Sequence, residues 1–175
     1  MTLQHRGPAT PTPEVLAPLR RRLAAALYEI LLLAALLVVV GFALLPVTSP
    51  AAGAGLPTPS GAARAISFWA TFFALAGYAA YFWTHGRRTL PMKTWHLRIM
   101  RADGTALTAG TALLRYVAGW IGPGLALIAY LALRNGGHAR QALWLLAFNF
   151  LWAFVDRKRL FLHDRLARTR IVVAS

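Results

Sequence analysis

The residues best placed to do chemistry are the few polar side chains that interrupt long apolar stretches, because such groups are costly in an apolar environment. Glu29, Arg115 and Asn149 are residues of this kind. If each stretch is a helix with a rise of about 1.5 Å per residue, all three lie about 6–11 Å inside the same edge of the apolar layer. Equal depth permits a Glu29–Arg115 ion pair with Asn149 as a neighbouring hydrogen-bond partner. Arg22, seven residues before Glu29, lies on the same helix face.

Two interpretations of this group remain open. In the functional one, the group is an ion- or proton-handling site in which Glu29 is the titrating carboxylate. In the structural one, an ion pair fixes the register of the helices, and Arg115 extends its long side chain toward the membrane surface. The sequence favours the structural interpretation, because only one carboxylate lies inside the apolar stretches.

The remaining ionisable residues indicate little catalytic chemistry. Asp156 and Asp164 lie among basic residues, which predicts solvated partners of those residues. His163 is interpreted as a surface imidazole, and without a second nearby histidine no metal site is expected. Cysteine is absent, which excludes disulfides and thiol nucleophiles. No phosphate-binding glycine loop, nucleophile elbow or metalloprotease helix occurs. We therefore expect no enzyme activity and no cofactor.

Composition indicates what must position these residues. Of the 175 residues, 58% are apolar and 14% are charged, against roughly 45–50% and 25% in soluble proteins. A soluble domain of this length could not hide so much apolar surface. The chain is therefore predicted to be an integral membrane protein with the lipid bilayer as its main partner.

Four apolar stretches predict an all-α membrane protein built as a four-helix transmembrane bundle. The predicted spans are residues 23–45, 65–84, 111–132 and 141–155. The first would be about 34 Å long as a helix, enough for a hydrocarbon core of about 30 Å. A signal peptide is the alternative for this stretch, but its apolar part would be about twice the usual length and would carry a carboxylate. An uncleaved span is therefore favoured.

The later spans carry two irregularities. Pro123 stands between Gly122 and Gly124 in the third span, and a proline there predicts a kink or break. The fourth span has 15 residues, about 22 Å as a helix, which is short for a crossing. It could thin the bilayer, begin earlier near His138, or be re-entrant.

Two segments outside the spans have their own character. Residues 94–107 alternate loosely between apolar and polar types around Asp103-Gly104, a tight-turn signal, which predicts a small cytoplasmic β-hairpin between spans two and three. The β-prone segment 170–173 is a candidate to pair with it. Residues 1–19 are polar and rich in proline and are predicted to form a disordered arm, so that residues 20–175 form one membrane domain.

The distribution of Lys and Arg predicts the orientation. Fifteen of them lie in residues 1–22, the 85–108 segment and the tail after Val155, against three in the two other loops. This asymmetry places both termini in the cytoplasm. The net charge of +14 is then mainly a topology signal, and nucleic-acid binding is not expected. Arg157, Lys158 and Arg159 are candidates for contact with anionic lipid.

Three segments carry a resemblance to a known family. The opening RLAAALYE of residues 22–29, the middle segment TLPMKTWHLRIMRADG of residues 89–104 with its continuation ALLR at 112–115, and the tail FVDRKRLFLHDRLART of residues 154–169 are similar to the RDD family of bacterial membrane proteins. The resemblance covers about residues 20–173. It departs from the family pattern at Glu29, where the family has Asp, and in a longer region 123–149.

The resemblance implies a place in the bacterial inner membrane and, for some members, a transport or cation-exchange role. It also points to Arg22, Glu29 and Asp164 as the motif residues, with Asp156 as an alternative for the last. We therefore predict a small ion or proton transporter component. Four spans leave little room for a two-sided pathway, so a homo-oligomer or a membrane partner is expected. The alternative is a non-transporting module that docks partner proteins.

Overall fold

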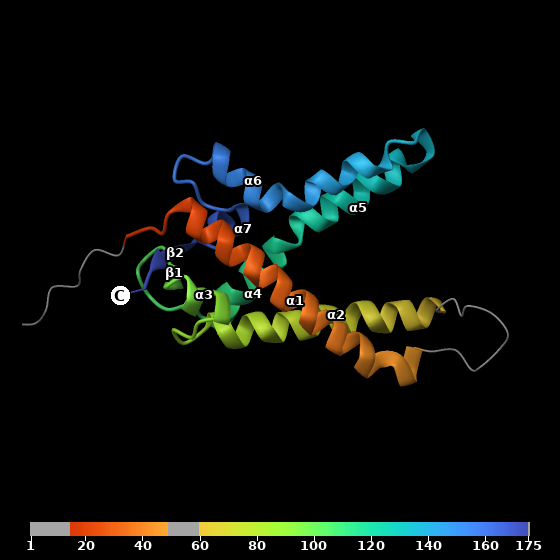
Figure 1. The fold of residues 1–175 in the computed structure, drawn as a ribbon, viewed down its shortest axis with the longest axis horizontal. Coiled ribbons are helices and arrows are strands. Elements are labelled where there is room, and N and C mark those ends of the chain that lie inside the picture. Colours follow the sequence, from red (N-terminus) through yellow and green to blue (C-terminus); the bar gives the residue numbers. More distant parts are fainter. Residues whose placement is uncertain (1–14, 49–59, 175) are drawn as a thin grey trace, which may run out of the picture.

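The computed structural model describes residues 15–48 and 60–174, which form two helical arms that diverge from a shared base (Figure 1). In the first arm, α1 (Leu19–Thr48) packs against α2 (Gly61–Trp83). In the second, α5 (Ile121–Leu133) packs along η2 (Ala139–Ala147), which continues into α6 (Phe148–Val155). The short η1 (Arg134–Gly136) follows α5. The part where both arms meet, formed by residues 15–18, 84–108 and 156–174, is called the base.

Hydroxyl side chains cap the first turns of two of the helices. Ser60 accepts a hydrogen bond from the backbone N–H of Ala63 at the start of α2. Thr108 does the same for Thr111 at the start of α4 (Ala109–Gly119). These caps satisfy backbone donors that have no partner in the first turn of a helix.

Three helical segments are long and apolar enough to cross a membrane: Leu19–Thr48, Gly61–Trp83 and Ala109–Gly136. Within α1, only Arg22 and Ala25 are buried, whereas Leu31, Val39 and Phe42 are more than 60% exposed. Apolar side chains on the outside of a helix need an apolar solvent. The described helices therefore fit contact with the lipid bilayer.

The fourth apolar segment, Ala139–Val155, is shorter than the other three. It begins at Ala139, close to His138, as one of the sequence alternatives allowed. Its first nine residues form a 3-10 helix, whose rise of about 2.0 Å per residue exceeds the 1.5 Å of an α-helix. The tighter winding lengthens the segment to roughly 30 Å, the thickness of a hydrocarbon core. The four-span count itself stays a prediction.

The break expected in the third span is present. α4 ends at Gly119 and α5 begins at Ile121, with Pro123 in the first turn of α5, where the missing N–H of proline costs no hydrogen bond. A Cβ added at Gly122 in α5 would lie 3.0 Å from the carbonyl oxygens of Leu145 and Leu146 in η2. This close approach of α5 and η2 requires a residue without a side chain.

The base contains a two-stranded antiparallel sheet, in which β1 (Leu97–Arg101) pairs with β2 (Thr169–Val173). The predicted local hairpin is therefore wrong in its partner, whereas the proposed pairing with residues 170–173 is confirmed. The Asp103-Gly104 turn forms, but Leu107 beyond it makes only an isolated bridge with Thr84. The physical reason is apolar area: the Ile-Val-Val run of β2 buries more beside β1 than Thr-Ala-Leu would.

The main hydrophobic core lies in the base rather than between the arms. Leu97, Phe161 and Val172 are almost fully buried there. The short helices α3 (Leu90–Thr94) and α7 (Leu162–Leu166) close the base beside the sheet.

The predicted arm, residues 1–19, lies mostly outside the described residues, and its described end belongs to the base. Ala17 is buried and donates its N–H to the carbonyl of Ile171 at 3.0 Å.

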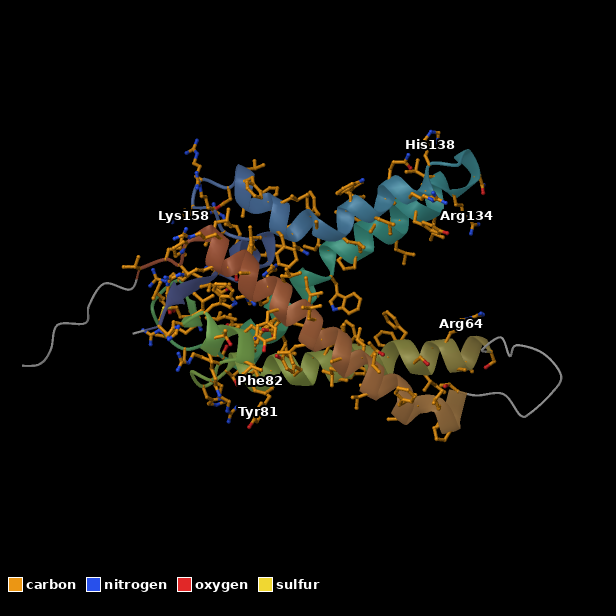
Figure 2. All side chains as sticks on the ribbon, viewed as in Figure 1. Arg64, Tyr81, Phe82, Arg134, His138 and Lys158 are labelled. Carbon is orange, nitrogen blue, oxygen red and sulfur yellow. The ribbon has the colours of Figure 1, made fainter. Side chains whose placement is uncertain are left out.

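Basic side chains lie at both ends of the molecule: Arg64 and Arg134 lie at the far ends of the two helical arms, and Lys158 lies at the base (Figure 2).

Candidate functional site

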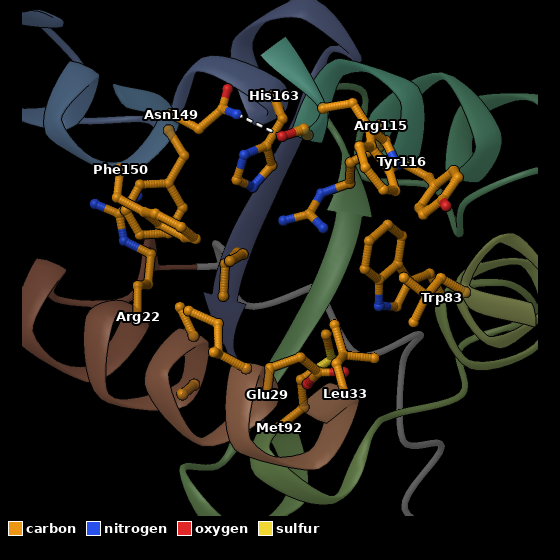
Figure 3. A pocket seen from close by; sticks show the side chains of 18 of the residues that line it. Arg22, Glu29, Leu33, Trp83, Met92, Arg115, Tyr116, Asn149, Phe150 and His163 are labelled. Carbon is orange, nitrogen blue, oxygen red and sulfur yellow. Dashed lines mark hydrogen bonds between the residues drawn. The ribbon is translucent and has the colours of Figure 1, made fainter. Parts of the chain in front are cut away.

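A cavity of about 380 Å³ lies where the two arms join the base (Figure 3). Its walls are mostly apolar and come from α1, α2, α4, α5, η2, α6 and the base. Five polar side chains that the sequence had drawn attention to line it: Arg22, Glu29, Arg115, Asn149 and His163. Glu29, Arg115 and Asn149, which the equal-depth argument grouped, line the same cavity.

The permitted Glu29–Arg115 ion pair does not form. Glu29 instead accepts two short hydrogen bonds, from the Tyr78 hydroxyl at 2.6 Å and from the Thr89 hydroxyl at 2.7 Å. Among the described residues it makes no salt bridge. Its carboxylate is thus held by neutral donors on the wall of the cavity, without a cation beside it.

Arg115 pairs with Asp164 at the border of the base. Its Nε and Nη2 both lie 2.8 Å from Asp164 Oδ1, and both side chains are at most 5% exposed. Thr169 donates a further hydrogen bond to the same oxygen at 3.0 Å. The expectation that Asp164 is a solvated surface acid is therefore wrong, because the buried Arg115 guanidinium needs a counter-charge, and Asp164 rather than Glu29 supplies it.

Opposing effects act on the Asp164 carboxyl. Burial raises its pKa, but Arg115 and the hydrogen bonds from Arg115 and Thr169 outweigh burial and hold the pKa below its ordinary value. Asp164 therefore remains ionised at neutral pH and completes the ion pair.

His163 is not the surface imidazole that was expected. It lines the cavity between Phe150 and Phe161, whose rings lie 5.9 and 5.5 Å from its own. Its Nδ1 is buried without a hydrogen-bond partner. Burial, and then the charge of Arg115, lower its pKa to about 4. The imidazole is therefore neutral at pH 7.

Arg22 is 1% exposed and belongs to the same site. Its Nη2 donates to the backbone carbonyl of Arg159 at 2.6 Å, and its guanidinium lies over the Phe161 ring at 5.3 Å from the centroid. Its Nε and Nη1 have no hydrogen-bond partner. A buried cation with only one hydrogen bond is an expensive arrangement.

Asn149 and Asp156 have structural contacts. The Asn149 side-chain amide donates to the carbonyl of Gly119 at 2.7 Å and so satisfies a backbone acceptor at the break between α4 and α5. Asp156 accepts hydrogen bonds from the backbone N–H groups of Lys158 and Leu160 and thereby shapes the loop after α6. Neither Asp156 nor Asp164 lines the cavity, but Asp164 binds Arg115, which does.

Two functional partners were missed by the sequence reasoning. Tyr78 lies six residues before the end of the second predicted span, so the depth argument used for Glu29 would also have selected it. Thr89 is completely buried and caps α3 through the Met92 N–H while it donates to Glu29. No local signal marks this threonine, because its role depends on where α3 packs.

The arrangement offers hard oxygen atoms rather than metal-binding nitrogen or sulfur. No cluster of three His, Cys, Asp or Glu side chains occurs within residues 15–48 and 60–174. One carboxylate with two hydroxyls suits a proton or a weakly held monovalent cation better than a transition metal. The Arg115–Asp164 pair, in contrast, is closed and fixes α7 against α4.

Comparison with known proteins gives one finding. The model of the RDD family matches residues 16–168. Comparisons with curated proteins and with solved structures gave no match.

Proposed function

Since the chain belongs to the RDD family of membrane proteins, we propose that it is a component of ion or proton transport in the bacterial inner membrane, with Glu29 as the group that exchanges its proton. The observation that carries this proposal is the placement of Glu29 on the wall of the cavity with only hydroxyl partners. A carboxylate that is not committed to a guanidinium can release and regain a proton, and it can attract a small cation while it is ionised.

The hydroxyl groups give both states of Glu29 a partner. Tyr78 and Thr89 donate to the ionised carboxylate, and a hydroxyl oxygen can also accept from the protonated acid. The buried Arg115 is neutralised by Asp164, so its charge does not hold Glu29 in the ionised state. In this proposal, Glu29 has the functional role and the Arg115–Asp164 pair has the structural role, which the sequence analysis had left as alternatives for one group.

Orientation and assembly complete the proposal. The excess of Lys and Arg at the base supports a cytoplasmic location for the base, with the cavity near the cytoplasmic edge of the bilayer. One chain supplies few walls for a path to the other side, so the active form is a homo-oligomer or includes a membrane partner. The chain itself performs no covalent chemistry.

A vesicle assay tests the role of Glu29. The purified protein is reconstituted in liposomes that hold a pH-sensitive dye and an imposed pH gradient, and Na⁺, Li⁺ or K⁺ is added outside. The wild type should dissipate the gradient with at least one cation, and Glu29→Gln should not. Asp103→Asn is the matched control, because Asp103 lies on an exposed turn of the base. An unchanged response in Glu29→Gln would refute the proposed role.

A non-transporting docking module is the second candidate, and the closed Arg115–Asp164 pair favours it. A buried pair that fixes α7 holds the base as a rigid surface, as a docking site for a partner protein requires. Absence of any cation response in the wild type, together with co-purification of one defined partner through a base that is intact, would support this candidate instead.

A further inference from the structure

The cavity has the dimensions and lining of a ligand site. Its volume of about 380 Å³ falls within the range of about 300–1,000 Å³ that is typical of small-molecule sites. Most of its lining is apolar, from Ile30 and Leu33 on α1 to Leu75 on α2 and Leu146 on η2. A hydrophilic solute would lose hydration against these walls, whereas a hydrocarbon chain would not.

Most of the unpartnered polar atoms in the lining are donors, beside the acceptor Asn149 Oδ1 and the ring nitrogen His163 Nδ1. Arg22 contributes Nε and Nη1, and Trp83 contributes Nε1, all buried without hydrogen-bond partners. Arg115 uses Nε and Nη2 on Asp164, and Figure 3 shows its guanidinium pointing into the cavity. Unmatched donors and a guanidinium together favour an anionic ligand with several oxygen acceptors.

The charges of the site also favour an anion beside Arg22. Asp164 neutralises Arg115, and Glu29 is bound by Tyr78 and Thr89. Arg22 has no carboxylate partner among the described residues, although it is 1% exposed. Burial of a cation without a counter-charge is strongly unfavourable, and an anionic headgroup would remove that cost.

We propose that the cavity binds one anionic phospholipid, with an acyl chain between the two arms and the phosphate at Arg22. A phospholipid is the ligand that satisfies both halves of the site, because its chain matches the apolar walls and its headgroup matches the unpaired guanidinium group. Residues of both arms line the cavity, so the lipid would enter it from the surrounding bilayer between the arms. The proposal is independent of transport: a lipid bound here would stabilise the fold of a protein that moves no ion.

Binding is measured with the full chain purified in a neutral detergent. Native mass spectrometry counts retained lipid, and thermal unfolding is followed while phosphatidylglycerol is added; phosphatidylcholine, oleate and inorganic phosphate are separate additions. Phosphatidylglycerol should be retained at one molecule per chain and should raise the midpoint of unfolding. Phosphatidylcholine and inorganic phosphate should do neither.

Two variants locate the site, and one matched control separates it from the charged surface. Arg22→Gln should weaken retention about tenfold or more, since about 1.5–3 kcal/mol, the contribution of a hydrogen bond to a charged group, corresponds to roughly 10- to 150-fold. Arg21→Gln is the control, because Arg21 is the exposed neighbour on the same helix. Gly119→Leu should abolish retention by filling the cavity, since nothing lies within 4 Å of a Cβ added at Gly119.

The outcomes divide clearly. Loss in Arg22→Gln and Gly119→Leu with normal binding by Arg21→Gln supports the proposal. Equal loss in Arg21→Gln and Arg22→Gln would overturn it in favour of general attraction to the basic surface. Retention by Gly119→Leu, or equal stabilisation by inorganic phosphate, would overturn the acyl-chain assignment, and preference for oleate would replace the phospholipid by a free fatty acid. If Arg22→Gln does not fold, Gly119→Leu, which retains both arginines, still tests the proposal through its retention of phosphatidylglycerol.

Discussion

The two acids of the site, Glu29 and Asp164, have opposite surroundings although they belong to one region of the fold. Asp164 is completely buried and bound to a guanidinium and a hydroxyl. Glu29 is only partly buried and is bound by two hydroxyls at the cavity wall. A buried ion pair such as that of Asp164 cannot lose one charge without leaving the other unpaired, which suits a structural role. A hydroxyl-bound acid such as Glu29 can change its charge at lower cost, which suits proton exchange.

The largest expected effect comes from removing the charge of Asp164. Asp164→Asn leaves the Arg115 guanidinium buried without a counter-charge, and we expect a loss of about 3–5 kcal/mol of unfolding free energy. Chemical unfolding in detergent measures this loss. The double variant Arg115→Met with Asp164→Leu should recover most of it, because it removes both charges at once. If the single variant were as stable as the wild type, the structural assignment of this pair would be wrong.

The next effect is a pH dependence that originates beside Asp164. Folding lowers the pKa of His163 from its ordinary 6.5 to about 4, so the unfolded chain binds a proton in this interval and the folded chain does not. Stability should therefore be complete above pH 6.5 and fall by about 3 kcal/mol as the pH decreases to 4, at about 1.4 kcal/mol per pH unit. Unfolding at a series of pH values measures the slope.

The matched variant for this slope is His163→Gln, which has no imidazole to titrate. Its stability should depend less on pH between 6.5 and 4 than that of the wild type. The same slope in both proteins would assign the titration to another group.

A smaller stability effect is expected at Glu29. Glu29→Gln retains an acceptor oxygen for one of the two hydroxyls, so the unfolding free energy should change by about 1 kcal/mol. The same variant should lose the cation response of the vesicles. A loss as large as that of Asp164→Asn would remove the contrast between the two acids, because Glu29 would then also be structural.

The smallest effect is expected at the pair of the exposed Arg165 with Asp156, whose own side chain is 7% exposed and whose oxygen lies 3.6 Å from the Arg165 nitrogen. The Arg165 side chain is 53% exposed, and Arg165→Ala should change stability by less than about 0.5 kcal/mol. Thermal unfolding of this variant beside Asp164→Asn provides the scale for the larger effects. A loss above 1 kcal/mol would show that burial is not what distinguishes the two pairs.

The sequence predicted three long apolar helices and grouped three of the residues that line the cavity, but it did not predict their partners. The depths of Glu29, Arg115 and Asn149 follow from the constant rise of a helix, which explains why they line one cavity. The partner of Arg115 depends on how each helix is rotated and on where α7 docks. Asp164 is 49 residues away in the chain, and no spacing rule connects the two. The family motif named Asp164, but its role as a buried counter-charge became visible only in the packed base.

The sheet illustrates the same limit. The Asp103-Gly104 turn is a strong local signal and it does form, yet the strand before it pairs with residues 169–173. A local turn predicts the direction of the chain, whereas strand pairing depends on which apolar segment is available to cover the core. The segment 169–173, whose sequence signal is weaker and which lies farther along the chain, therefore forms the second strand of the base.

The pairing of β1 with β2 also has a consequence for biosynthesis. All the long helices precede β2 in the chain, so they can enter the bilayer during translation, while β1 and the segment around Leu16 wait for residues 169–173 to leave the ribosome. The last step of assembly then joins the earliest described residues to the latest. A nascent chain that stops a few residues short would insert its helices but lack the β1–β2 pairing, and its base would be open to quality-control proteases.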